Sequence, residues 1–358
     1  MIDTIRNAWK IIDLRKKILY TILMIIIFRL GSCIPVPLLD PAAMKEIFTS
    51  DNSLFGFIDV ISGGAFQNAT IFAMSITPYI NSSIIMQLLT VAIPALERLQ
   101  KQGEDGRKKI AQITRYGTVV LAFIQAIGLY FMLKSYNAVT NPGLLTAVVV
   151  IFTFTAGTAF LMWLGEQITE KGVGNDISLI IFAGIVSRLP SMAQSLYAYA
   201  KGGGIGLIGV VALLIMIVVV VGLVVMMNEA ERRIPVQYAK RVVGRKMYGG
   251  QSTHIPIKVA SAGVIPIIFA MSIMSFPSTI AGFFGVTSQT GGFWGGFLKI
   301  FSSTSWVYAI LYFLLIIFFT YFYTAIQFNP IEMSNNMKKN GGFIPGIRPG
   351  RPTSEYIS

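Results

Sequence analysis

Charged residues are scarce in this chain. Only 13% of its 358 residues are Asp, Glu, Lys or Arg, whereas about 25% is usual in soluble domains. Hydrophobic residues make up 54%, and the mean hydropathy is +0.67. Because so few charges cannot keep so apolar a chain in water, the composition excludes an ordinary soluble fold and indicates a membrane protein.

Cysteine and histidine are almost absent. Cys33 is the only cysteine and His254 the only histidine, which excludes a disulfide framework, a Cys/His zinc site and a Cys–His nucleophile pair. The sequence also lacks a Gly-x-x-x-x-Gly-Lys-Ser/Thr run to hold nucleotide phosphates. We therefore expect no catalytic residue, no metal and no cofactor, and if the protein does work, something else must supply the energy.

Long stretches without charge indicate where the chain can cross a membrane, which takes about 20 mostly apolar residues per helix. Eight such spans are predicted. They are residues 18–36, 60–96, 116–133, 135–165, 177–187, 202–228, 259–298 and 300–331. Arg29 is the one charged residue inside these stretches, so the predicted architecture is an all-α polytopic membrane protein.

Lys and Arg are distributed unevenly between the predicted connections. With the N-terminus in the cytoplasm, 23 of the 29 basic residues fall on cytoplasmic segments and five on external ones. Basic residues accumulate on the cytoplasmic side of membrane proteins. We therefore predict that both termini are cytoplasmic and that the first span is an uncleaved anchor rather than a signal peptide.

Two features suggest a central site. The hexapeptide IFAMSI occurs at 71–76 and at 268–273, next to Pro78 and Pro266, in spans that cross in opposite directions. This is typical of inverted repeats around a functional site, although a chance match is the alternative.

Residues 54–67 are amphiphilic and interrupted by Gly63 and Gly64. They fit a short re-entrant segment or an ordinary external loop equally well.

The side chains of the predicted spans have two interpretations. Polar residues of the second span form interhelical hydrogen bonds or a hydrophilic seam: Thr77, Asn81, Ser82, Ser83 and Gln87. Isoleucines near the interrupted spans are core or lipid-facing residues, or else an apolar constriction that excludes water: Ile76, Ile80, Ile181, Ile185 and Ile268.

Two long segments, 228–258 and 329–358, are rich in basic and turn-forming residues. A connection of about thirty residues exceeds the usual 2 to 8 between helices. Such loops suit an acidic protein face, anionic lipid or RNA phosphate, or they simply follow the distribution of positive charge.

Seven segments of the sequence are similar to those of a known family. They are RLGSCIPVP, FGFIDVISGGAF, ITPYINSSIIMQLL, GEDGRKKIAQITRYGT, MWLGEQITEKGVGNDISLIIFAGIV, QSTHIPIKVASAGVIPIIFA and GGFIPGIRPGRPT. They occur in order and resemble the SecY family, the channel-forming subunits of the bacterial Sec protein translocase, over essentially the whole chain.

The resemblance implies a helical channel of two pseudo-symmetric halves, with eight of the family's ten transmembrane helices present and the chain truncated after the eighth. It implies a pore ring of Ile76, Ile80, Ile181, Ile185 and Ile268, and a lateral gate with Asn81 facing Phe276. It also implies a plug at 55–65. The plug residues are Phe55, Gly56, Phe57, Ile58, Asp59, Val60, Ile61, Ser62, Gly63, Gly64 and Ala65.

The same resemblance implies partners. These are the SecE and SecG subunits, the SecA motor ATPase, the ribosome, polypeptide substrates with signal sequences, and membrane lipid. Contacts with motor or ribosome are expected at Lys240, Arg241, Arg245, Lys246 and Arg348. The location would be the bacterial plasma membrane.

The predicted organisation is an N-terminal half at 1–190 and a partial C-terminal half at 191–358. The expected function is passage of unfolded polypeptides across the membrane and lateral release of transmembrane segments into lipid, without enzymatic activity. A small-molecule secondary transporter is the alternative, supported by the repeat but opposed by the lack of acidic residues within the spans. An intramembrane enzyme is a weaker alternative, for want of paired acids or a Ser/His arrangement.

Overall fold

A computed structural model describes most of the chain. The described residues are 9–40, 43, 59, 62–174, 176–202, 207–238, 241–243, 246–248, 252–260, 262–283, 296, 298, 300–301, 305–327, 330–339 and 341–357. They form two compact units: Met1–Ser195 with Met271–Leu311, and Leu196–Ala270 with Tyr312–Ser358.

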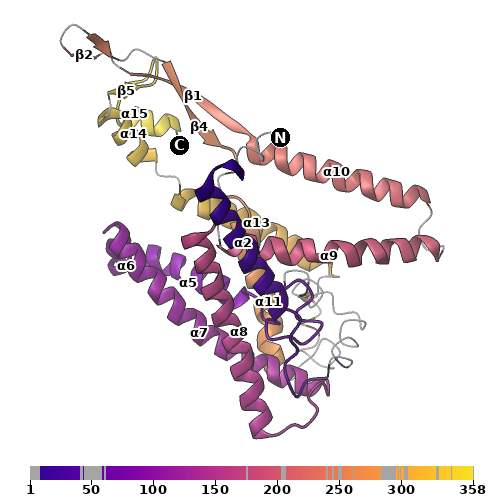
Figure 1. The fold of residues 1–358 in the computed structure, drawn as a ribbon. Helices are drawn as coiled ribbons and strands as arrows, with labels where there is room; N and C mark the ends of the chain where they lie inside the picture. The colour runs from indigo at the N-terminus through magenta and orange to yellow at the C-terminus, as the bar shows by residue number, and fades with distance from the viewer. Residues whose placement is uncertain are drawn as a thin grey trace. The chain divides into compact units, whose positions relative to one another are not determined.

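Every predicted span overlaps a helix, although the bounds differ (Figure 1). These helices are α2 (Ile12–Gly31), α5 (Thr77–Ala92), α7 (Glu104–Ser135), α8 (Leu144–Lys171), α9 (Asp176–Lys201), α10 (Leu207–Glu229), α11 (Ile265–Phe283) and α13 (Trp306–Gln327). Among the described residues, α7, α8, α9, α10 and α13 are each long and apolar enough to cross a membrane, and α5 with α6 (Pro94–Gln100) is a sixth, broken candidate bent by 105°.

Proline determines where α5 begins and ends. Pro78 lies in its first turn, where a missing N–H costs nothing because that group has no helical partner. At the other end Ile93 is extended and Pro94 begins α6, since the residue before a proline is driven out of the helical region. The bend between the two helices therefore has a local cause.

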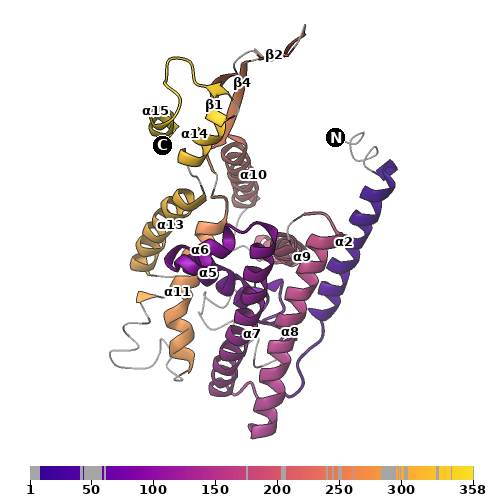
Figure 2. The same ribbon diagram turned by 90° about the vertical axis from the view of Figure 1, so that its left-hand side faces the viewer.

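In the first unit, α7 and α8 lie side by side in both views (Figures 1 and 2). The buried face of α7 repeats every four residues and consists mainly of small side chains: Thr114, Thr118, Ala122, Ala126 and Tyr130. Small residues let helix backbones approach closely. In lipid the hydrophobic effect does not drive helices together, so such close packing is what holds them. Acidic Glu104 and Asp105 at its first turn and Lys134 in its last turn complement the helix dipole.

The second unit contains a β-sheet that the sequence analysis did not predict. The sheet is ordered β4-β1-β5 and antiparallel, formed by β1 (Glu231–Tyr238), β4 (Ser252–Lys258) and β5 (Gly342–Phe343). A separate ribbon pairs β2 (Arg241–Val243) with β3 (Lys246–Tyr248). Both long basic segments, expected only as loops, therefore meet in one sheet.

The sheet has a small core of its own. Ile234 and Val236 of β1 are buried with Met337 of α14 (Pro330–Lys339) and with Ile344. Helix α14 lies beside β1 and β4 in both views (Figures 1 and 2). Alternate residues of a strand point to the same face, so positions 234 and 236 fill this core while Pro235 faces away. β5 pairs only with Gln237 and Tyr238 of β1. At Pro235, β1 therefore pairs with β4 alone and is an edge strand, where the missing N–H of proline is tolerated.

Candidate functional site

The buried centre of the first unit is an apolar cluster of residues from α2, α8, α9 and the non-helical segment that precedes α5. Its buried members are Met24, Phe28, Ala65, Phe72, Ile76, Leu161, Leu164, Ile168, Ile180 and Ala183, and Ile80 packs against it. Ile76 and Ile80, both predicted for the pore ring, thus meet α9 at Ile180 and Ala183. The end of the predicted plug, Ala65, belongs to the same cluster.

The other predicted ring residues lie elsewhere. Ile181 is half-buried and Ile185 is 42% exposed, so they lie on a more open side of α9 than Ile180. Ile268 is half-buried on α11 in the second unit. Its neighbour Phe269 is buried, with ring centroids 5.3 Å from Phe319 of α13.

Part of the predicted plug is described by the structure. Asp59, Ser62, Gly63, Gly64 and Ala65 are seen, and all except Gly63 are buried. The remaining predicted plug residues lie outside the described residues: Phe55, Gly56, Phe57, Ile58, Val60 and Ile61.

Asp59 is 2% exposed and has several partners. Its Oδ1 accepts a hydrogen bond from the Gln67 backbone N–H at 2.8 Å, and its Oδ2 forms an ion pair with Nη2 of Arg188 from α9. The Gln67 side chain accepts a hydrogen bond from the same Arg188 nitrogen at 3.4 Å. Arg29 of α2 donates to the carbonyl oxygen of Gly63 at 3.3 Å. Sequence reasoning missed this network, because neither arginine stands near the plug in the sequence.

Residues 65–76, here called the linker segment, are non-helical and mostly buried. The segment is tied to the chain after α2, because Val36 donates its N–H to Ala69 at 2.8 Å and Ile71 donates to Ile34 at 3.0 Å. Ser75 has a φ of +53°, which is uncommon for a residue with a side chain. Non-helical backbone inside a membrane protein is tolerated where protein covers it, so the described part favours the re-entrant alternative over an external loop.

The predicted lateral gate is only partly seen. Asn81 lies on α5, and its amide oxygen is buried without a hydrogen-bond partner among the described residues. Its neighbour Ser82 donates a hydrogen bond to the carbonyl oxygen of Thr114 on α7 at 2.9 Å. Phe276 belongs to α11, but its side chain lies outside the described residues, so the pairing with Asn81 stays a prediction.

Three of the predicted partner-contact residues lie in the described part of the second unit. Arg241 is in β2, Lys246 is in β3, and Arg348 is exposed between β5 and α15 (Arg351–Ile357). Lys240 and Arg245 lie outside the described residues. Two further cations, Arg232 and Arg233, are exposed on β1, so the sheet presents positive charge beyond the predicted set.

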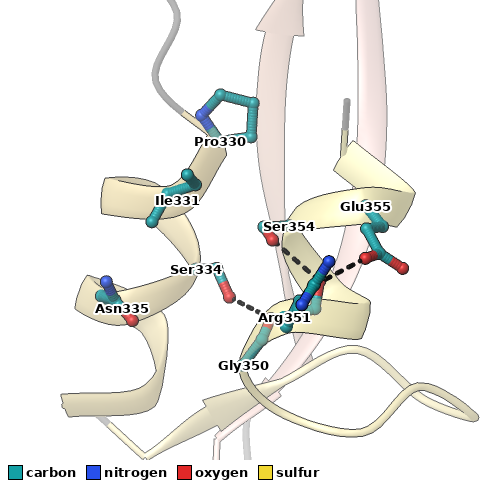
Figure 3. Close-up of a pocket in the computed structure, with 8 residues that line it drawn as sticks. All are labelled: Pro330, Ile331, Ser334, Asn335, Gly350, Arg351, Ser354 and Glu355. Carbon is teal, nitrogen blue, oxygen red and sulfur yellow. Dashed lines mark hydrogen bonds and ion pairs between the residues drawn. The ribbon is translucent and has the colours of Figure 1, made fainter.

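A groove of about 640 Å³ lies between α14 and α15 (Figure 3). In it Ser334 donates a hydrogen bond to the Gly350 carbonyl oxygen at 2.7 Å, and Arg351 pairs with Glu355 at 3.1 Å. The side chains of Ser334, Arg351, Ser354 and Glu355 thus find partners within the groove itself (Figure 3). Across the described part of the chain, no three His, Cys, Asp or Glu residues lie close enough to hold a metal ion.

Comparison with known proteins gives consistent matches. The SecY family matches residues 70–358. The protein translocase subunit SecY of Halalkalibacterium halodurans is 46% identical over 368 residues, covering 100% of this chain and 84% of that protein. The SecY subunit of Escherichia coli strain K12 is 45% identical, covering 96% of this chain and 79% of its own length.

Solved structures agree in fold. A structure described as a protein-conducting channel has a TM-score of 0.66 at 18% identity, covering 96% of this chain and 80% of that one. A SecY structure described for its plug domain, which stabilises the closed state, has a TM-score of 0.68 at 19% identity with the same coverage. Sec61 in a canine ribosome-channel complex has a TM-score of 0.51 at 19% identity, covering 79% of this chain and 62% of that one.

These matches decide for the protein channel over the small-molecule transporter and the intramembrane enzyme. The relatives at 45–46% identity are translocase subunits of bacteria, and they cover this chain nearly end to end. The chain therefore belongs to the SecY family, as a multi-pass membrane subunit of the protein-conducting Sec channel that transports proteins and is not an enzyme.

Proposed function

We propose that Ile76, Ile80, Ile181, Ile185 and Ile268 form the constriction through which the polypeptide passes. The observation that supports this is the apolar cluster in which Ile80 of α5 and Ile76, the residue just before α5, meet α9 and the end of the plug segment. An apolar constriction makes no specific hydrogen bonds with the substrate, so it accepts many sequences, and a narrow apolar ring also excludes water and ions.

We further propose that residues 55–65 are the plug and that α5 and α11 border the lateral gate near Asn81 and Phe276. The buried amide oxygen of Asn81 lacks a partner among the described residues. Burying such a group without a hydrogen bond costs free energy, which favours a helix boundary that can separate and expose the amide. The N-terminal half, 1–190, and the partial C-terminal half, 191–358, would be the two walls of the channel.

The basic surface of the second unit is proposed to bind partners that supply the energy. A solved relative is described within a ribosome-channel complex, and Arg348 is exposed next to the sheet. We assign Lys240, Arg241, Arg245, Lys246 and Arg348 to contacts with the SecA motor or the ribosome. The proposal includes both termini in the cytoplasm and SecE and SecG beside the chain in the membrane.

The pore assignment is tested by disulfide trapping in the assembled translocase. Cys33 is replaced by serine, Ile80 by cysteine, and a stalled secretory polypeptide with one cysteine of its own is presented. Ile22 of α2 is 44% exposed, and Ile22→Cys in the same background is the matched control. We expect an adduct with the polypeptide at position 80 and none at position 22.

An adduct that forms equally at both positions, or at position 22 alone, contradicts the pore assignment.

The basic contacts are tested separately by Arg348→Glu, with Lys134→Glu as a control on the opposite predicted side. Ribosome and motor binding are measured at two salt concentrations. Electrostatic contacts weaken with salt, so we expect Arg348→Glu to lower both the affinity and its salt dependence, and equal affinity for the two variants opposes the assignment.

A further inference from the structure

We propose that Arg188 is a positioning residue of the closed channel, which holds the plug in place through its ion pair with Asp59. The inference rests on the plug assignment made above and adds the residue that retains the plug. It also makes Arg188 a determinant of which substrates open the channel, because a stronger attachment demands a better signal sequence.

The burial of Asp59 is the first reason. Its side chain is 3% exposed and that of Arg188 is 21% exposed. A buried carboxylate is strongly unfavourable unless it is both paired with a cation and hydrogen-bonded. Arg188 provides the cation, and the Gln67 N–H provides the hydrogen bond at 2.8 Å. Moving Asp59 out of this place breaks both contacts together.

A second arginine increases the effect. Arg29 binds the Gly63 carbonyl oxygen at 3.3 Å, and its charge acts repulsively on Arg188. The plug thus supplies the carboxylate of Asp59 to Arg188 and the carbonyl oxygen of Gly63 to Arg29. When the plug moves away, both arginines lose these partners, and the repulsion between the two guanidinium groups is no longer offset. The closed arrangement is therefore favoured by the charges on α2 and α9, and not only by apolar packing.

The backbone at Gly63 and Gly64 makes the close approach possible. Both residues have positive φ, +66° and +90°, which glycine adopts without strain. A Cβ atom at position 63 would lie 2.9 Å from the Gly184 Cα, and one at position 64 would lie 3.3 Å from Arg188 Nη2. The plug therefore touches α9 directly beside the ion pair.

The residues that follow are fixed independently. Thr70 forms an isolated antiparallel bridge with Pro35, and Gly157 of α8 touches the backbone of Ile71. Movement of the plug is thereby confined to the chain before this part of the linker segment. Asp59 lies on the movable side of that boundary and Arg188 lies on α9, so a change in the strength of the ion pair alters the closed state without altering the helix packing.

The test is a double-mutant cycle in the complete translocase, reconstituted in proteoliposomes. Arg188→Gln, Asp59→Asn and the double variant are compared for leak of a small ion through the resting channel and for export of a protein with a defective signal sequence. Removing one partner of a buried pair leaves an unpaired charge, so we expect each single variant to raise leak and defective-signal export about tenfold. The double variant should raise them by about the same factor, since coupled residues are not additive.

Two controls separate this role from a general loss of stability. Lys201→Gln removes an exposed cation from the same helix, α9, and should leave the leak unchanged. Arg188→Lys retains the charge and should close the channel better than Arg188→Gln. Melting temperature in detergent is recorded for each variant, because the proposal expects leak to change more than stability.

Three results would overturn the proposal: single variants that do not leak, single effects that multiply in the double variant, or a leak that follows loss of melting temperature alone. Deletion of residues 55–65 distinguishes the two levels of inference. If the channel without residues 55–65 leaks ions while the Arg188→Gln channel does not, the plug assignment stands and the role of Arg188 fails. If neither leaks, both fail.

Discussion

Gly157 of α8 lies directly against the carbonyl oxygen of Ile71. A Cβ atom at position 157 would lie 2.0 Å from that oxygen and 3.5 Å from the Phe72 ring. The linker segment is therefore held against α8 by backbone proximity, and Phe72 continues the contact by stacking with Phe28 at a centroid distance of 6.1 Å. The backbone between the plug and α5 can pack this closely against α8 only because position 157 has no Cβ atom.

Gly157→Ala should accordingly destabilise the first unit. The neighbour is backbone rather than a flexible side chain, so one region must shift, and overpacking of this kind costs about 1–3 kcal/mol. The measurement is the thermal unfolding midpoint in detergent. Gly222 of α10 has nothing within 4 Å, and Gly222→Ala should instead be neutral or gain up to about 1 kcal/mol from helix propensity. Equal effects of the two substitutions would refute this contact.

Cys33 offers a direct test of the proposed orientation. It is free and exposed, just beyond the C-terminal end of α2. With the N-terminus in the cytoplasm, Cys33 lies at the external face, so a membrane-impermeant maleimide should label it in intact spheroplasts. In a Cys33→Ser background, Asn335→Cys on the exposed side of α14 should react only after permeabilisation. The reverse pattern would invert the topology.

Ile268→Asn should weaken the proposed constriction. A polar side chain at a narrow apolar ring favours wetting, so we expect raised ion conductance of the resting channel and easier passage of proteins with poor signal sequences. The adjacent Ile267 is 42% exposed, and Ile267→Asn is the matched control. If Ile268→Asn changes neither the ion conductance nor the requirement for a good signal sequence, Ile268 is not part of the constriction.

Val236→Ala should loosen the basic sheet of the second unit. Val236 is fully buried beside Ile234, Met337 and Ile344, and removing two methyl groups there costs about 2 kcal/mol. Tryptic cleavage at Arg233 of β1 measures local opening, and that cost raises the rate about 30-fold when opening is a fast equilibrium. Val219→Ala, at a 53% exposed position of α10, should leave cleavage unchanged. If both cleave alike, Val236 contributes little to the sheet.

The positions of the membrane helices followed from the sequence. Transfer of a segment into lipid depends on its own composition, so charge-free stretches located α7, α8 and α10 without knowledge of any neighbour. Family membership was also accessible, because SecY-like segments such as ITPYINSSIIMQLL are contiguous in the chain. The break at Pro94 was not predicted, because the second span was expected to run from 60 to 96, although its cause is a local steric effect.

The sheet could have been found only in part. Apolar residues stand at every second position in both strands, at Ile234 and Val236 and at Ile255 and Ile257. This alternation is typical of a strand, but the prolines and basic residues between and around these positions made it hard to recognise. Pairing β1 with β4 and adding β5 from a distant segment depends on which strands meet. No local pattern specifies that choice.

The site itself required the tertiary structure. Periodicity placed Ile181 and Ile185 on one face of α9, yet Ile180 is the residue buried with Ile76, because the packing partners decide which face of an apolar helix is covered. Asp59 and Arg188 are far apart in the chain, and only the fold brings their charges together. The sequence by itself determined which segments enter the membrane, since that depends on local hydrophobicity. Which residues meet inside depended on packing between segments, which is a property of the whole structure.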